Sequence, residues 1–297
     1  MKQQIRSAGL LFLTAVIWGV AFVAQSVGMD YIRPFTFNGV RCILGGMVLL
    51  PYLFFLKKLQ KNTEKKENLK EKKQLLIGGI CCGICLCMAS NLQQIALQSA
   101  AVGKAGFLTA CYIVLVPIFG LFLKKTCSSY IWVSVGLTLW GLYLLCVKGT
   151  FFLEAVDYLL LLSALFFAVH ILVIDYFSPL VNGVKMACIQ FFICGFFSLA
   201  TAAVVEKPQF SQILAAWLPL LYAGVLSCGV GYTLQIVGQK GMNPTIASLI
   251  LSLESVVSVL AGWVLLGQKM TGREMIGCGI IFAAIILAQI PPKKEVS

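Results

Sequence analysis

Charge is scarce in this 297-residue chain: charged residues make up 11% of it, and it contains a single histidine. A soluble domain has roughly a quarter of its residues charged, so this composition excludes an ordinary soluble protein. Hydrophobic residues make up 60% of the chain, and its mean hydropathy is +0.93. The sequence therefore predicts a polytopic membrane protein, whose first partner is the lipid bilayer.

Signatures of catalysis are also absent. The chain has no H-E-x-x-H, no G-x-S-x-G and no phosphate-binding loop. Acids away from the termini and loops are Glu254 and, at the edges of apolar segments, Asp157 and Asp175. Hydrolysis by paired carboxylates is therefore poorly supported. We expect no enzyme, no cofactor and, in this chain alone, no ATP-driven pump.

The net charge of +12 does not indicate a nucleic-acid partner, because the positive residues lie at the ends of apolar segments. The densest run, residues 57–73, holds eight lysines and is expected to be a solvated cytoplasmic loop.

The twelve cysteines are mostly scattered through apolar segments as small hydrophobic residues. A metal-like spacing occurs in one cluster, but ligation inside a membrane helix would bury several thiolates, so no metal site is predicted for Cys81, Cys82, Cys85 and Cys87.

Apolar stretches long enough to cross a bilayer follow one another along the chain. They lack the period-2 alternation of strands, and proline and glycine mark the breaks between them. Ten such spans place both termini on one side, and the excess of lysine and arginine on that side predicts that it is cytoplasmic. The predicted spans are 8–27, 34–56, 74–98, 102–123, 129–148, 157–177, 184–205, 213–237, 243–266 and 272–290.

The two halves of the chain match each other. Segment 83–98 matches segment 224–239 at an offset of 141 residues, and an offset of about 149 sets Arg41 against Gln190. The matches fall in the same order along both halves, which indicates two copies of one five-span unit. Because five is odd, the second copy enters the membrane from the other side, as in many secondary transporters.

This repeat predicts an all-α polytopic membrane protein with ten transmembrane helices. The helices form two inverted five-helix repeats, residues 8–148 and 157–290, around a central cavity. Each repeat also carries a polar stripe whose i, i+3, i+4, i+7 spacing marks one helix face. The stripes are Gly83, Cys87, Ser90, Asn91, Gln94 and Gln98, and Gly224, Ser227, Cys228, Gly231, Tyr232, Gln235 and Gln239.

Polar groups on a membrane helix need partners, either on another helix or in a cavity that holds water and substrate. The matched stripes favour the cavity, while inter-helix hydrogen bonds stay the alternative. An ionisable group at mid-membrane is costly and usually faces the interior, which singles out Glu254. Arg41 either pairs with Glu254 or extends toward an interface. His170 is either a packed, hydrogen-bonded residue or a proton relay.

Aromatic residues near these groups either line the cavity or serve packing. Ser252 shares the small, polar half of span 243–266 with Glu254. The candidate substrate-binding residues are therefore Trp18, Arg41, Asn91, Gln94, Tyr112, His170, Tyr232, Gln235, Ser252 and Glu254.

Several motifs together resemble the EamA-type branch of the drug/metabolite transporter superfamily over nearly the whole chain. They are Trp18–Phe22, Phe37–Arg41, Lys104–Ala110 with Leu115–Pro117, Ala247–Leu249, Ser252–Ser255 and Gly262–Gly267. The resemblance implies ten helices around a central cavity, with the fifth and tenth at the periphery. It also implies alternating access and small metabolites such as amino acids, often exported. The family often has proline after the acid of span 9, where this chain has Ser255, so the family's kink is not predicted there.

The sequence thus predicts a secondary active transporter that moves a small metabolite, such as an amino acid, across the cytoplasmic membrane by alternating access. Export is the expected direction, and a proton is one option for the coupling ion.

The alternative is a sugar-phosphate or nucleotide-sugar exchanger, which would need several cationic side chains in the cavity. The spans contain Arg41 as one such cation and Lys104 as a candidate for a second, so this alternative ranks lower. The other alternative is a membrane scaffold or sensor subunit that does not transport. The inverted repeat argues against it, because such a protein gains nothing from access to both sides of the membrane. The oligomeric state stays open.

Overall fold

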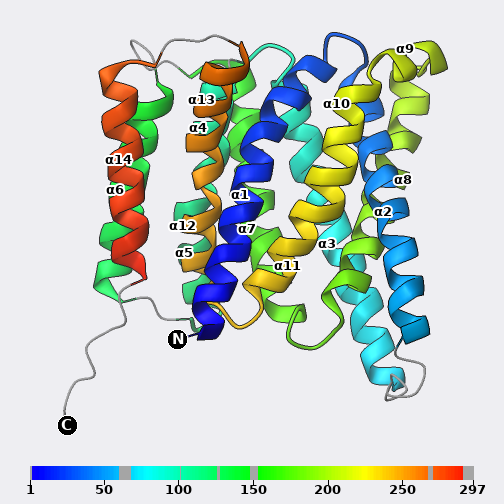
Figure 1. Ribbon diagram of the computed structural model, residues 1–297, viewed down its shortest axis with the longest axis horizontal. Coiled ribbons are helices and arrows are strands. Elements are labelled where there is room, and N and C mark those ends of the chain that lie inside the picture. The colour runs from blue at the N-terminus through cyan, green and yellow to red at the C-terminus, as the bar shows by residue number, and fades with distance from the viewer. Residues whose placement is uncertain are drawn as a thin grey trace.

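The computed structural model describes residues 2–59, 68–100, 102–125, 128–147, 153–266 and 270–289. This part of the chain folds into a bundle of helices and contains no strand, which confirms the predicted all-α class (Figure 1). Of the predicted lysine-rich loop 57–73, residues 60–67 lie outside the described residues.

The first half of the chain forms six helices. Its elements are α1 (Lys2–Gly28), α2 (Pro34–Leu59), α3 (Leu69–Ala96), α4 (Val102–Ala110), α5 (Tyr112–Phe122) and α6 (Ser129–Cys146). The second half contains α7 (Ala155–Phe177), α8 (Gly183–Val205), α9 (Phe210–Ala215), α10 (Trp217–Leu221), the π-helix η1 (Tyr222–Tyr232), α11 (Thr233–Gln239), α12 (Pro244–Leu251), α13 (Leu253–Leu266) and α14 (Gly272–Ala288).

Within the described ranges, 9 helical segments are long and apolar enough to cross a membrane. The tenth predicted span corresponds to α14, which has 17 residues. The bundle is therefore a multi-pass membrane protein. Figure 1 shows the N-terminal end of α1 and the C-terminal end of α14 on the same face of the bundle, which we call the N-terminal face; the other end of the bundle is the opposite face.

Close helix packing joins the two halves at several places, including two where glycine lies at the contact. At the edge of the bundle α6 lies against α14, where the resemblance implies peripheral fifth and tenth helices (Figure 1). Gly141 and Gly277 sit at this contact: a Cβ added to Gly277 would lie 2.7 Å from the Gly141 carbonyl oxygen. Elsewhere α2 packs on α8, where a Cβ on Gly195 would lie 2.7 Å from Ile43. Small residues thus let membrane helices approach closely.

A carboxylate also ties the halves together at the opposite face. Glu206 follows α8 and accepts hydrogen bonds from the backbone N–H of Phe35 (2.9 Å) and of Thr36 (2.8 Å). The Thr36 hydroxyl donates to the same carboxylate at 2.7 Å. These N–H groups start α2 and have no partner within the helix, so the negative charge of Glu206 caps its positive end.

Two spans are interrupted near their middles, at Cys111 between α4 and α5 and at Ser252 between α12 and α13. These residues are 141 positions apart, the offset of the internal repeat. The Ser252 hydroxyl donates to the Leu249 carbonyl at 2.7 Å, and the Cys111 thiol donates to the Phe107 carbonyl at 3.5 Å. Such side-chain bonds compete with the helical pattern and bend helices. The break beside Glu254 therefore needs no proline at Ser255.

The π-helix η1 changes the predicted polar stripe of span 8. Its wider turn sends residues spaced for an α-helical face toward different neighbours. Gly224 and Cys228 approach α2, Gly231 approaches Trp18 of α1, and Tyr232 lines the cavity described below. All seven residues of the predicted stripe are nevertheless buried, so the stripe faces the interior of the bundle, and its members within η1 contact α2, Trp18 or the cavity. Side chains of α1 bond to η1 carbonyls: Trp18 Nε1 donates to Ser227 O at 3.3 Å.

Gly277→Ala should destabilise the protein, because the new methyl group meets backbone atoms of α6 that cannot move aside. Overpacking of this kind costs about 1–3 kcal/mol. The measurement is the thermal unfolding midpoint in detergent. The matched control is Gly279→Ala on the same helix, where a Cβ would meet no atom within 4 Å. The control should keep or slightly raise the midpoint, since alanine favours helix over glycine. Equal midpoints for the two variants would contradict this packing.

Candidate functional site

A small cavity lies inside the bundle, between helices of both halves. It is lined by Trp18, Ala21, Phe22, Gln25, Arg41, Gln93, Thr109, Tyr112, Phe167, Ile171, Ser227, Tyr232, Gln235, Leu251 and Glu254. The volume open to a water-sized molecule is about 40 Å³, which accommodates a few water molecules. A typical small-molecule pocket is roughly 300–1,000 Å³, so the cavity has no room for a metabolite in this conformation.

The two interrupted spans meet at the cavity wall. Glu254 follows the break of span 9 and is 6% exposed. Its Oε1 accepts a hydrogen bond at 3.1 Å from the hydroxyl of Tyr112, which follows the break of span 4. Next to this contact, the Ser255 hydroxyl donates to the Gly106 carbonyl at 3.3 Å. The repeat symmetry therefore brings the breaks of spans 4 and 9 together around one carboxyl group.

Arg41 supplies a cation to the same cavity and is 3% exposed. Its Nη1 donates to Gln25 Oε1 at 2.8 Å, and Gln94 Nε2 donates to the backbone carbonyl of Gln25 at 3.2 Å. The guanidinium carbon also lies 5.8 Å from the centre of the Phe37 ring, within the range of a cation–π contact. Arg41 Nε is buried and has no hydrogen-bond partner among the described residues.

Arg41 and Glu254 line one cavity without forming an ion pair with each other; the ion pairs within the described ranges involve Lys104 and Lys125. Arg41 is held by a neutral amide and Glu254 by a neutral phenol. Burying a charge is costly unless it is paired or hydrogen-bonded. Neither side chain therefore has an oppositely charged partner in the cavity, and both can bond to a ligand that carries the complementary groups.

Aromatic rings form the remaining wall of the cavity. Trp18 and Tyr232 lie 4.5 Å apart between ring centres. Tyr232 also packs edge-on against Phe191 at 5.7 Å and against His170 at 6.0 Å. Phe167, which the repeat aligns with Trp18, lines the cavity from α7. The cavity thus combines two charges with apolar surface, as small-molecule sites do.

The structure brings six of the ten candidate residues together at this cavity: Trp18, Arg41, Tyr112, Tyr232, Gln235 and Glu254. The other four lie elsewhere and bond to protein. Asn91 bonds to Asn38 (2.9 Å) and Ser198 (2.8 Å), and His170 Nε2 bonds to Gln190 Oε1 at 3.1 Å. Ser252 bonds within its own helix, and Gln94 supports Gln25.

Four polar residues of the cavity wall are absent from the sequence-based candidates: Gln25, Gln93, Thr109 and Ser227. Gln25 and Gln93 lie within apolar spans, and this signal was available in the sequence. Ser227 belonged to the predicted stripe, but the spacing of the stripe could not show which of its members line the cavity and which face α2. Among the described residues, no group of three or more His, Cys, Asp or Glu side chains could hold a metal ion.

Comparisons with known proteins agree on a transporter family. The model of the "EamA-like transporter family" matches residues 6–147 and 155–289. An "Uncharacterized transporter" of Archaeoglobus fulgidus is 30% identical over 281 residues, which are 94% of this chain and 84% of the relative. A solved structure described as "Crystal structure of protein" has a TM-score of 0.76 at 16% identity, covering 95% of this chain and 96% of the other. This last likeness concerns the fold alone.

Tyr112→Phe should destabilise the protein, because it removes the hydroxyl that Glu254 accepts from. A buried polar group left without its partner costs about 1–3 kcal/mol. The readout is again the thermal unfolding midpoint in detergent. Tyr158→Phe, at a side chain that is 60% exposed, is the matched control and should leave the midpoint unchanged. A Tyr112→Phe protein as stable as its control would argue against the Tyr112–Glu254 contact.

Proposed function

Because this chain belongs to the EamA-like transporter family, we propose that it is a secondary active transporter of a small zwitterionic metabolite such as an amino acid. In this proposal the cavity is the substrate site and opens to one face of the membrane at a time. The substrate is moved out of the cell, a direction that rests on the family resemblance alone.

The observation that carries the proposal is the presence of Arg41 and Glu254 in one cavity without a mutual ion pair. An arginine recognises a carboxylate through its fork of N–H donors, and the free Arg41 Nε leaves such a donor unused. A carboxylate accepts hydrogen bonds from an ammonium group. A zwitterion offers both groups, while the aromatic wall formed by Trp18 and Tyr232 offers surface to an apolar side chain.

The alternatives fit the site less well. A sugar-phosphate or nucleotide-sugar exchanger needs several cations at the cavity, and Arg41 is the cation among the lining residues described. The other candidate, Lys104, is engaged in an ion pair with Asp157. A scaffold or sensor subunit without transport has no use for two buried, unpaired charges, which cost stability.

The size of the cavity supports a cycle of opening and closing. With about 40 Å³ open to water, an amino acid enters only after helices around the cavity have moved apart. Helices of both repeats line the cavity, so rocking of one repeat against the other would expose it to alternate faces.

Glu254 is the proposed site of coupling to protons. The titratable groups that share the cavity with its carboxyl group are Tyr112, Arg41 and Tyr232. When the ammonium group of the substrate leaves, a proton can neutralise the carboxylate in its place. Exchange of substrate for a proton at one carboxyl group is therefore a simple means of coupling their opposite movements.

The proposed location is the cell membrane, with the N-terminal face in the cytoplasm. The described lysines of the predicted loop 57–73 lie at the ends of α2 and α3 on the side of the N-terminus, in accord with the positive-inside rule. At or near helix ends on the same side lie Lys124, Lys125, Lys185 and Lys240. The two repeats are proposed to comprise residues 8–148 and 157–290, as predicted from the sequence.

Arg41→Gln should weaken substrate binding by roughly 10- to 100-fold, because a hydrogen bond to a charged group is worth about 1.5–3 kcal/mol. The substrate is first identified by thermal stabilisation of the purified protein across amino acids, nucleosides and sugars, and its affinity is then measured by calorimetry. Arg33→Gln, at an exposed arginine on the opposite face, is the matched control and should bind as the wild type does. Stabilisation by a nucleotide sugar and by no amino acid would favour the exchanger instead.

Glu254→Gln should abolish the dependence of substrate flux on a pH gradient in proteoliposomes, because the amide cannot exchange a proton. Glu71→Gln is the control: it keeps a capping side chain at the exposed start of α3 and should retain pH-dependent flux. If Glu254→Gln also retained it, Glu254 would be excluded as the coupling site.

A further inference from the structure

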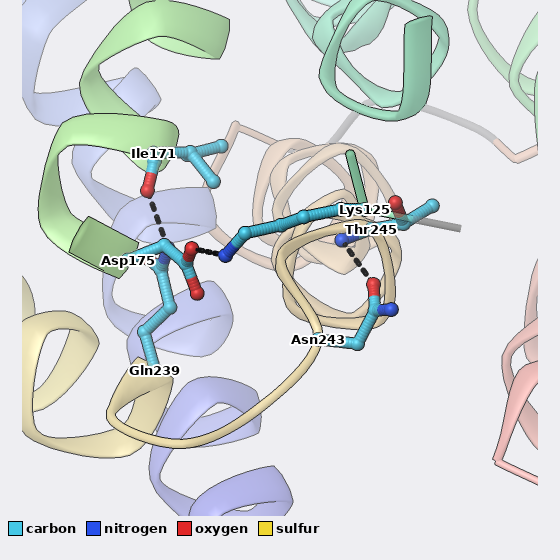
Figure 2. Close-up of polar contacts among 6 residues, drawn as sticks. All are labelled: Lys125, Ile171, Asp175, Gln239, Asn243 and Thr245. Carbon is cyan, nitrogen blue, oxygen red and sulfur yellow. Dashed lines mark hydrogen bonds and ion pairs between the residues drawn. The ribbon is translucent and has the colours of Figure 1, made fainter. Parts of the chain in front are cut away.

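Helix α7 carries one acid near each end, and each acid is paired with a lysine of the same neighbouring span. Asp157 lies in the first turn of α7 and is 0% exposed; its Oδ2 lies 2.6 Å from the Nζ of Lys104 at the start of α4. Asp175 lies in the last turn, and its Oδ2 bonds to the Nζ of Lys125, just after α5 (Figure 2). Span 4 and α7 are therefore tied at both ends of the membrane.

The two tied elements belong to different repeats and both line the cavity. Span 4 contributes Thr109 and Tyr112, and α7 contributes Phe167 and Ile171. Separation of α7 from span 4 at one end would widen the cavity toward that face. An ion pair that joins these elements at their ends is thus placed to control the opening.

A second contact strengthens the closure on the side of the N-terminal face. Gln239 Nε2 of α11 donates to the carbonyl of Ile171 at 2.6 Å, one turn of α7 before Asp175. Figure 2 shows these two contacts side by side, with Lys125 reaching across to Asp175. Since the Ile171 side chain lines the cavity, these bonds close the bundle directly beside the cavity.

The lysines of the two pairs are partly exposed, at 23% for Lys104 and 39% for Lys125. Their carboxylate partners are less exposed, at 0% for Asp157 and 10% for Asp175. Water can hydrate each ammonium group as soon as the pair separates, so breaking a pair strands no lysine in the protein interior. Both pairs are present in this structure, whose cavity is too small for a metabolite.

We propose that Lys104–Asp157 and Lys125–Asp175 are alternating latches of the transport cycle. The Lys125–Asp175 latch breaks when the cavity opens to the N-terminal face, and the Lys104–Asp157 latch breaks when it opens to the opposite face. This structure, with both latches closed, is the occluded state between the two. The inference rests on the proposed function, because it requires a cavity that opens to each face in turn.

Hydrogen–deuterium exchange of the full-length protein in lipid nanodiscs tests the latches without any substrate. Asp175→Asn should accelerate amide exchange about fivefold in residues 171–177, because the loss of an ion pair raises the local opening equilibrium. It should leave residues 159–163, at the other end of α7, equally or better protected. Asp157→Asn should give the reverse pattern. Asp30→Asn, at an exposed acid in the loop after α1, is the control and should change neither end.

The charge-swapped variant Lys125→Asp with Asp175→Lys should restore the protection lost in Asp175→Asn, which separates the effect of the ion pair from a folding defect. Equal loosening of both ends by each acid variant, or no change in either, would overturn the latches. In parallel, flux of the substrate identified by thermal stabilisation is measured in proteoliposomes for the wild type and for both acid variants. Absence of wild-type flux would contradict the proposed function, whereas wild-type flux that is unaltered in both acid variants, with unaltered exchange, would contradict the latches alone.

Discussion

The hydrogen bond between Tyr112 and Glu254 is the contact around which the rest of the cavity is arranged. A carboxyl group inside a membrane bundle needs a partner, and its nearest one here is a phenol from the other repeat. Both residues lie within two positions of a helix break, so spans 4 and 9 must meet for the bond to form. Arg41, held by Gln25, then faces this site as the complementary charge.

The architecture is symmetric, but its chemistry is not. The breaks at Cys111 and Ser252 are related by the repeat offset, yet the same offset places Ile113, an apolar residue, against Glu254. Arg41 likewise corresponds to Gln190, which bonds to His170 away from the cavity. Duplication supplies two matching scaffolds, while substitution within each copy leaves one acid and one cation between them. The proposed alternating access would use this combination as a two-sided gate around a single polar site.

Hydropathy and the internal repeat were sufficient to predict the helical spans and the membrane environment, because lipid permits few backbone arrangements. The family was predicted from the resemblance of several motifs. The sequence could not predict η1: the polar stripe assumed an α-helical period, and the wider turn redirected Gly224 and Gly231 to neighbouring helices. Nor could it distinguish Gln235, which lines the cavity, from Asn91, which bonds to Asn38 and Ser198. Both are amides in a stripe, and only the arrangement of other helices decides which finds protein partners.

In the proposed function, Arg41 and Glu254 jointly hold one zwitterionic substrate in an occluded cavity. An experimental structure of the protein with a transported substrate bound would test this arrangement. We expect ligand density between the two side chains, with the substrate carboxylate within hydrogen-bonding distance of the Arg41 guanidinium and its ammonium group at Glu254. Density outside this cavity, or a direct Arg41–Glu254 ion pair with the substrate bound elsewhere, would contradict it.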